Sequence, residues 1–131
     1  MHRPTFFFDR NIGRKLPQAL LQLNPPFDVR FHDKEAFHNQ TPDDEIMSVV
    51  GPKGWIIVSQ DWKWHIIEAE LAAVKQHKAK CLYLPGSGAD RWTTYCRFIR
   101  SHKNIIRRCG AETAPFILDL KANGQLKKIE L

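Results

Sequence analysis

The chain has 131 residues, of which 43% are hydrophobic and 11% aromatic, and its formal net charge is +6. This length suits one domain (residues 1–131) with a buried core, and the aromatic content argues against disorder. No apolar run approaches the roughly 20 residues of a membrane span, and Asp9 and Arg10 interrupt the first apolar run, so we expect no signal peptide, no membrane association and a cytoplasmic protein. The positive charge favours polyanionic partners such as nucleic acid.

The cysteines are odd in number and widely spaced, at positions 81, 96 and 109. This pattern predicts buried, reduced thiols, with a zinc site or a cysteine nucleophile as the alternative.

Strands and helices are expected to alternate from the N-terminus. Residues 5–8 predict a short buried strand, and Asn11 is expected to cap a helix that runs to about Leu23. Residues 27–31 alternate apolar and polar side chains, which predicts a second strand. A polar loop, residues 32–40, follows.

The middle of the chain continues the alternation. Thr41 is expected to cap a helix that ends at Gly51, and residues 55–59 are apolar enough for a strand covered on both faces. A helix over about residues 66–77 and a strand over 80–84 come next.

The longest predicted helix covers about residues 90–107, and its core face is expected to consist of Trp92, Tyr95, Cys96, Ile99 and Ile106. A C-terminal hairpin is predicted over about residues 115–131, because Asn123 and Gly124 suit a tight type I′ turn. The complete pattern predicts an α/β fold, a three-layer α/β/α sandwich with a mostly parallel central sheet.

Acidic residues follow the predicted buried strands. Asp9 comes after the first strand, Asp61 after the strand over residues 55–59, and Asp43 opens a helix between them. Carboxyl ends of parallel strands point into the crevice where α/β proteins bind ligands. Several carboxylates there repel one another unless a cation neutralises them, and oxygen ligands suit Mg²⁺ or Mn²⁺. The sequence therefore predicts a metal-dependent hydrolytic site.

Three segments, in order, carry a family resemblance: Phe8-Asp9-Arg10-Asn11-Ile12, Pro42-Asp43-Asp44-Glu45-Ile46 and Ile57-Val58-Ser59-Gln60-Asp61. Between about Phe6 and Leu120 the chain resembles the PIN-like nucleases, most closely the VapC-type toxin branch. The resemblance implies a metal-dependent endoribonuclease that hydrolyses RNA phosphodiester bonds. It also implies the toxin role in a type II toxin–antitoxin system, a cognate antitoxin protein as partner and a possible homodimer.

By its motifs the resemblance makes Asp9, Asp43 and Asp61 the catalytic residues and the ligands of Mg²⁺ or Mn²⁺. Many members carry a further glutamate on a helix between the first two acids. This chain is shorter there, and Asp33 or Glu35 is only a loose substitute, which leaves the number of metal ions open.

Each acid also has an ordinary structural interpretation. Asp9 could cap a helix, and Asp43 could be a first-turn acid that interacts with the helix dipole. Asp44 and Glu45 are expected to be solvated acids of the helix start, and either would take the place of Asp43 if the register differs by one. Ser59 could hydrogen-bond a ligating acid or simply end a strand, and Glu70 is expected on an exposed helix face unless it joins the site.

RNA contacts are expected from basic and aromatic side chains near the acids. Trp62, like its neighbour Trp64, could stack on unpaired bases or pack within the protein. Basic side chains could contact phosphates or remain ordinary solvated surface, and the candidates are Arg10, Arg14, Arg97 and Arg100.

Two other functional classes remain open. A PIN-like module without catalytic activity, binding nucleic acid or a protein partner, would keep the fold and lack a complete acid set. A flavodoxin-like or Rossmann-type ligand-binding domain is disfavoured, because no glycine-rich turn follows the first strand.

Overall fold

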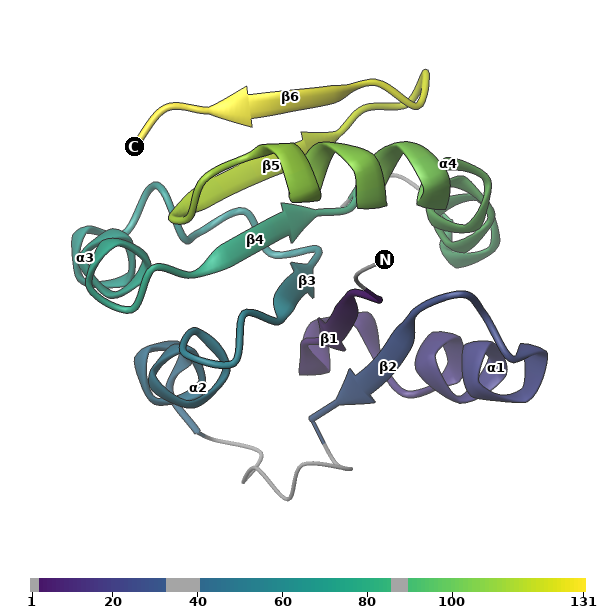
Figure 1. Ribbon diagram of the computed structural model, residues 1–131, viewed down its shortest axis with the longest axis horizontal. Helices are drawn as coiled ribbons and strands as arrows, with labels where there is room; N and C mark the ends of the chain where they lie inside the picture. The colour runs from purple at the N-terminus through teal and green to yellow at the C-terminus, as the bar shows by residue number, and fades with distance from the viewer. Residues whose placement is uncertain (1–2, 33–40, 86–89) are drawn as a thin grey trace.

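The computed structural model describes residues 3–32, 41–85 and 90–131. Six strands form one sheet in the order β2-β1-β3-β4-β5-β6, and all neighbours are parallel except the β5–β6 pair (Figure 1). The strands are β1 (Thr5–Phe8), β2 (Asp28–Phe31), β3 (Ile56–Ser59), β4 (Lys80–Tyr83), β5 (Phe116–Leu120) and β6 (Leu126–Ile129).

Helices cover both faces of the sheet, so the predicted three-layer α/β/α sandwich is confirmed. Helices α1 (Lys15–Leu23) and α4 (Arg91–Ala111) lie on one face, and α2 (Asp43–Val50) and α3 (Glu68–Gln76) lie on the other (Figure 1). None of these described helices is long and apolar enough to cross a membrane.

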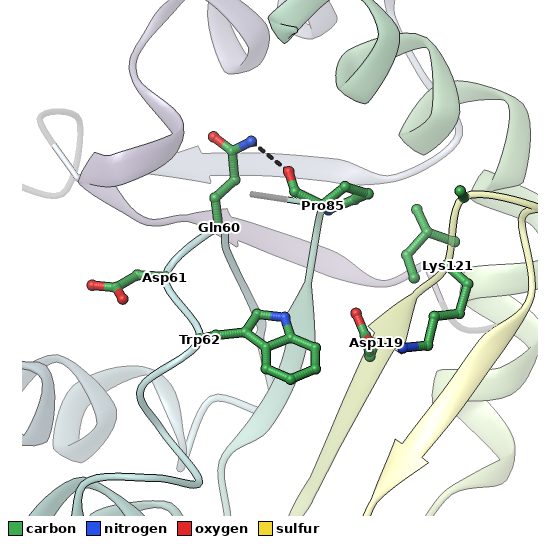
Figure 2. A pocket seen from close by; sticks show the side chains of 8 residues that line it. Gln60, Asp61, Trp62, Pro85, Asp119 and Lys121 are labelled. Carbon is green, nitrogen blue, oxygen red and sulfur yellow. Dashed lines mark hydrogen bonds and ion pairs between the residues drawn. The ribbon is translucent and has the colours of Figure 1, made fainter. Parts of the chain in front are cut away.

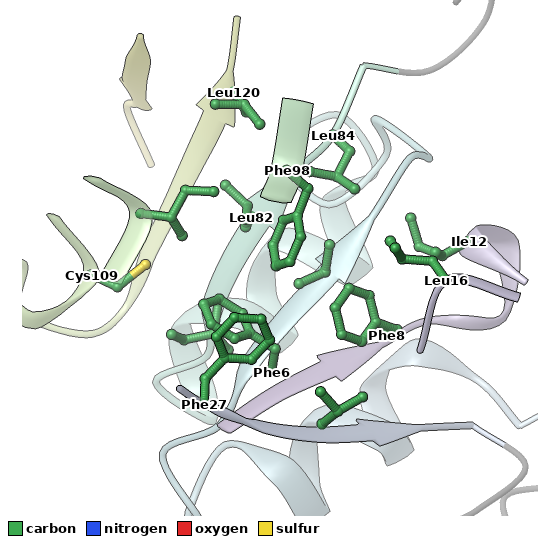
Figure 3. Close-up of a cluster of buried hydrophobic side chains, with 14 of the residues drawn as sticks. Phe6, Phe8, Ile12, Leu16, Phe27, Leu82, Leu84, Phe98, Cys109 and Leu120 are labelled. Carbon is green, nitrogen blue, oxygen red and sulfur yellow. The ribbon is translucent and has the colours of Figure 1, made fainter. Parts of the chain in front are cut away.

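The core on the α1 and α4 side is aromatic at its centre. Phe98 of α4 makes edge-to-face contacts with Phe6, Phe8 and Phe27, at ring-centroid distances of 5.5, 5.5 and 6.0 Å (Figure 3). Edge-to-face pairs of this kind add about 0.5–1.5 kcal/mol each to the burial of apolar area. Strand β1 is therefore firmly held from this side.

The core on the α2 and α3 side is built around the next residue of the same strand. Phe7 packs there with Ile46 and Met47 of α2, Ile57 of β3 and the fully buried Trp64. Because successive side chains of β1 point to opposite faces and both faces are covered, residues 6–8 are all buried. The apolar run that precedes Asp9 is thus explained by its central place in the sheet.

Several predicted boundaries and faces are wrong. The first helix is divided by Gly13, whose φ of +85° separates a short 3-10 turn, η1 (Arg10–Ile12), from α1, and Asp9 rather than Asn11 caps that turn. Helix α2 begins after Pro42, with no side-chain cap from Thr41.

Helix α4 turns a different face to the core than its hydrophobic pattern predicts. Trp92 and Ile99 are exposed, at 78% and 40% of their surface, whereas the buried positions are Thr94, Phe98, Ile105 and Cys109. The predicted positions Tyr95 and Ile106 pack at the edge of the core, and Cys96 is half-buried.

The predicted C-terminal hairpin is confirmed, but its turn is longer than a type I′ turn. Lys121 donates its backbone N–H to the carbonyl of Gln125 at 2.8 Å, and Gly124 has a φ of +86° while Asn123 does not adopt a positive φ. A type I′ turn would require a positive φ at both central residues.

The order of the strands determines where a site can form. The chain runs from β1 outwards to β2 and then returns to place β3 on the other side of β1. Connections therefore leave β1 and β3 in opposite directions, and the carboxyl ends of these strands open a crevice, as at the ligand sites of other open α/β sheets.

Candidate active site at the carboxyl ends of β1 and β3

Asp9 lies at this crevice, directly after β1. Its backbone N–H continues the sheet by donating to the carbonyl of Val58 at 2.9 Å, and the residue is 5% exposed. Burial and then the nearby Asp43 carboxylate raise the pKa of Asp9 to about 6. A buried carboxylate whose pKa is raised by burial and by a neighbouring carboxylate is typical of functional sites.

Asp43 reaches the same point from the first turn of α2. It is 9% exposed, whereas its neighbours Asp44 and Glu45 face solvent. Trp64 donates its indole N–H to Asp43 Oδ2 at 3.1 Å, and Asp9 and Asp43 line one small cavity of about 10 Å³. The register thus makes Asp43, and not Asp44, the inward acid of this helix start.

The side chain of Lys63 lies beside the acidic cluster, which consists of Asp9, Asp43, Asp61 and Glu70. The Lys63 ammonium lies 3.7 Å from Asp43 Oδ2, 3.5 Å from Asp61 Oδ2 and 3.5 Å from Glu70 Oε1. Burial opposes its charge, but the carboxylates of Asp43, Glu70 and Asp61 together raise the pKa of Lys63. Sequence analysis missed Lys63, because it lies in the irregular segment after β3, where no periodicity predicts its direction.

Asn11 and Ser59 connect the two strand ends. The Asn11 amide donates to Asp9 Oδ2 at 3.1 Å and to Ser59 Oγ at 2.7 Å, and its carbonyl oxygen accepts from the backbone N–H of Gln60 at 3.0 Å. Ser59 Oγ also accepts from the backbone N–H of Asp61 at 3.0 Å. Ser59 therefore supports Asp9 through Asn11, and Asn11 is a second residue that sequence analysis did not select.

Asp61 and Glu70 join the site at its rim. The Asp61 side chain is 49% exposed and contacts Lys63, so it is the most open of the three predicted acids. Glu70 was expected on an exposed face, but its side chain is only 16% exposed. Burial raises the pKa of Glu70, and the Asp43 carboxylate adds to this shift while Lys63 opposes it.

The predicted nucleic-acid contacts fall into three places. Arg10 and Arg14 line a pocket of about 220 Å³ that also contains Asp9, so they flank the buried acid. Trp62 is 42% exposed, whereas Trp64 is 1% exposed and cannot stack on a base. Arg97 and Arg100 lie on α4, half-buried and exposed respectively, outside the pockets that contain the acids.

Other possible chemistries receive less support. Asp33 lies outside the described residues. Within the described parts of the chain, no group of three or more histidine, cysteine or acidic side chains is arranged to hold a metal ion, so Asp9, Asp43 and Asp61 are not brought together as the predicted set of three ligands. The thiols are free, and burial raises the pKa of both Cys81 and Cys109, which disfavours a thiolate nucleophile.

Comparison with known proteins supports the fold. A family model described as a PIN-like domain matches residues 4–86, more than half of the chain, including β1, the start of α2 and β3. No curated protein and no solved structure matches the chain. The matched region contains Asp9, Asp43 and Asp61, and the chain belongs to the PIN-like domain family.

Proposed function

We propose that the protein is a metal-dependent endoribonuclease that hydrolyses RNA phosphodiester bonds. The observation that carries the proposal is the buried pair Asp9 and Asp43 at the ends of neighbouring elements, where burial and mutual repulsion raise the pKa of Asp9 to about 6. PIN-like domains are commonly nucleases, and the pair lies within the residues that match the family. A buried charge without an ion-pair partner destabilises the fold. The presence of such a carboxylate, Asp9, at a crevice therefore favours a role in binding a cation.

The donor set fits a divalent cation of the hard type. Mg²⁺ is commonly held by one or two carboxylates and retains several waters, so Asp9 and Asp43 would be sufficient ligands for Mg²⁺ or Mn²⁺. Asp61, which is more exposed, would act through water. When bound, the cation would supply a water of lowered pKa and neutralise charge on the phosphodiester.

The remaining residues have roles that follow from their contacts. Asn11 fixes the direction of the Asp9 carboxylate by donating to Oδ2, and Ser59 fixes Asn11. Lys63 connects Asp43 and Asp61 by lying within ion-pair distance of both carboxylates. Trp64 holds Asp43 through the indole N–H, so Asp43 is presented with one carboxylate oxygen already engaged.

The RNA substrate and the biological role are further parts of the proposal. Arg10 and Arg14 beside Asp9 could contact a phosphate backbone, and the net charge of +6 favours such a partner. The toxin role, a cognate antitoxin and a possible homodimer are proposed from the resemblance to the VapC-type branch.

The chemistry is tested by incubating the purified protein with single-stranded RNA and Mg²⁺ or Mn²⁺. We expect cleavage that EDTA abolishes and that Asp9→Asn removes. Asp28→Asn is the matched control, because Asp28 is an exposed acid of β2 that pairs with Arg3 at 2.8 Å. Equal cleavage by the Asp9→Asn variant and the parent would overturn the assignment of the site.

One observation favours a second function, a PIN-like module that binds nucleic acid or a protein partner without cleaving it. Lys63 already neutralises part of the acidic cluster, since it lies within 3.7 Å of three carboxylates. In that case RNA would bind with a steep salt dependence and Mn²⁺ would change nothing. A titration with Mn²⁺ followed by calorimetry separates the two functions.

A further inference from the structure

A groove of about 650 Å³ lies beside the acidic cluster, at the carboxyl ends of β3, β4 and β5. Figure 2 shows its lining residues, with Trp62 facing Asp119 and Lys121 across the groove and the Asp61 carboxylate directed away from Trp62. Asp61 lines this groove and also contacts Lys63, so it connects the groove to the acidic site.

Trp62 is held as a flat platform on one wall. Its ring stacks on Tyr83 at 5.3 Å with an interplanar angle of 26°, and Tyr83 in turn stacks on the buried Trp64 at 5.1 Å and 17°. The rings of His65 and Trp62 form an edge-to-face pair, with centroids 5.2 Å apart and an interplanar angle of 76°. The ring therefore has a fixed orientation, although 42% of its surface remains exposed.

The opposite wall is polar and nearly neutral. Asp119 is 4% exposed and its Oδ2 lies 2.7 Å from the Lys121 ammonium, which is itself 5.7 Å from the centre of the Trp62 ring. Gln60 donates from Nε2 to the carbonyl of Pro85 at 2.8 Å, which orients its side-chain amide at the edge of the groove.

This charge distribution favours a neutral planar group over a phosphate. The lining side chains carry two acids, Asp61 and Asp119, against one cation, Lys121, whereas the pocket beside Asp9 carries Arg10 and Arg14. An unpaired nucleobase has a π-face for an aromatic platform and a polar edge for amide and charged groups.

We propose that this groove, lined by Gln60, Trp62, Pro85, Asp119 and Lys121, is a subsite that stacks one unpaired nucleobase of the RNA on Trp62. The inference rests on the proposed function for its substrate class and makes that class more specific. The substrate must be single-stranded where it crosses β3, because a base paired in a duplex cannot enter the groove.

The test measures binding without metal, so that no cleavage takes place. A fluorescein-labelled eight-residue oligoadenylate and an abasic oligomer of equal length and charge are titrated in EDTA and followed by anisotropy. We expect the parent to bind the oligoadenylate about 5- to 100-fold more tightly than the abasic oligomer. A duplex of the same sequence should lack this base-dependent gain.

Trp62→Ala should lose the base-dependent gain, and Trp62→Phe should keep most of it. Trp92→Ala is the control, because Trp92 is a 78% exposed tryptophan of α4 outside the groove. Tryptophan fluorescence provides a second measurement, since stacking should quench the parent more than Trp62→Phe. Equal affinity for the two oligomers, or an unchanged gain in Trp62→Ala, overturns the subsite.

The outcome is independent of catalysis. RNA cleavage that needs Mn²⁺ and Asp9 together with an unchanged gain in Trp62→Ala would overturn the subsite and leave the nuclease standing. A gain that depends on Trp62 in a protein that never cleaves RNA would do the reverse.

Discussion

Asp9 and Asp119 occupy similar places in the fold but differ in how their charge is balanced. Both are buried acids near the carboxyl ends of parallel strands, at 5% and 4% exposure. Asp119 has the Lys121 ammonium at 2.7 Å, whereas Asp9 lies close to Asp43, and no ion pair to Asp9 is present among the residues that the structure describes. The pKa of Asp9 is raised to about 6 as a result of its burial and of that neighbour.

The difference shows which buried acids indicate function. A buried carboxylate with its own cation is explained by structure, and it needs no ligand. A buried carboxylate next to another one is a cost to the fold that a bound cation removes. This difference in charge balance distinguishes the crevice at the carboxyl ends of β1 and β3 from the groove at the end of β5, although the two places are neighbours.

The largest expected effect concerns catalysis. Asp9→Asn should lower RNA cleavage by at least about 100-fold, because loss of a ligand should exceed the 10- to 100-fold cost that is typical when a residue supporting a ligand is lost. Asp28→Asn should cleave like the parent. The measurement is the initial rate with a fluorogenic single-stranded RNA in Mn²⁺, and a rate for Asp9→Asn within a few-fold of the parent would contradict the prediction.

The next prediction concerns stability against pH in EDTA. The pKa of Asp9 is about 6 in the folded protein against 3.8 for the ordinary group, so the folded state binds more protons between these values. The free energy of unfolding should therefore fall as pH rises through this window, by at most about 3 kcal/mol from Asp9. Urea unfolding of the parent and of Asp9→Asn at pH 4 and pH 8 isolates this contribution.

The same experiment compares the two acids directly. At pH 8, Asp9→Asn should be more stable than the parent, because the substitution removes a buried charge. The gain is reduced by weakening of the hydrogen bond that Asn11 donates to Asp9 Oδ2. Asp119→Asn should be less stable by about 1 kcal/mol, because it loses a charged hydrogen bond to a partly exposed lysine. Destabilisation of both variants by similar amounts would remove the distinction between the acids.

Lys63 provides a smaller and more specific test. Lys63→Met removes a cation that competes with a metal ion for Asp43, so the affinity for Mn²⁺ should rise about 5-fold, equivalent to about 1 kcal/mol. Lys53→Met is the matched control, because the Lys53 ammonium lies over the Trp55 ring, 4.5 Å from its centre, at the amino end of β3 and not at its carboxyl end. A loss of affinity in Lys63→Met would show that Lys63 supports the site instead of competing.

Asp61→Asn should have the smallest effect on metal affinity, less than about 3-fold, because the side chain is 49% exposed and solvent screens its charge. Calorimetric titration with Mn²⁺ measures the affinity of Asp61→Asn under the conditions used for Lys63→Met. A loss as large as that in Asp9→Asn would make Asp61 a direct ligand, as its motif predicts.

Much of the fold could be predicted because the central strands are strongly apolar. Residues 6–8 and 56–58 are buried on both faces, and runs of this kind leave few alternatives to a central parallel strand. Helix α4 was harder, because its buried face includes the polar Thr94 while the large Trp92 is exposed. Hydrophobicity alone cannot select a face when both faces carry apolar side chains.

The site could be predicted only where residues follow regular elements. Asp9 and Asp43 have directions that the strand end and the first helical turn determine. Lys63 and Asn11 lie in short irregular segments after the strands, and their contacts depend on where those segments fold in space. Glu70 was misplaced because a weakly amphipathic helix does not reveal which acid turns inwards.

The most direct test of the central claim, that Asp9 and Asp43 form a divalent cation site, is calorimetric titration of Mn²⁺ into metal-free protein at pH 7.5. The parent should bind with measurable heat and release fewer protons than at pH 6, because the pKa of Asp9 is about 6. Asp9→Asn should give no binding heat, while Asp119→Asn should bind like the parent. Binding by Asp9→Asn with unchanged affinity, or no binding by the parent, would contradict the account.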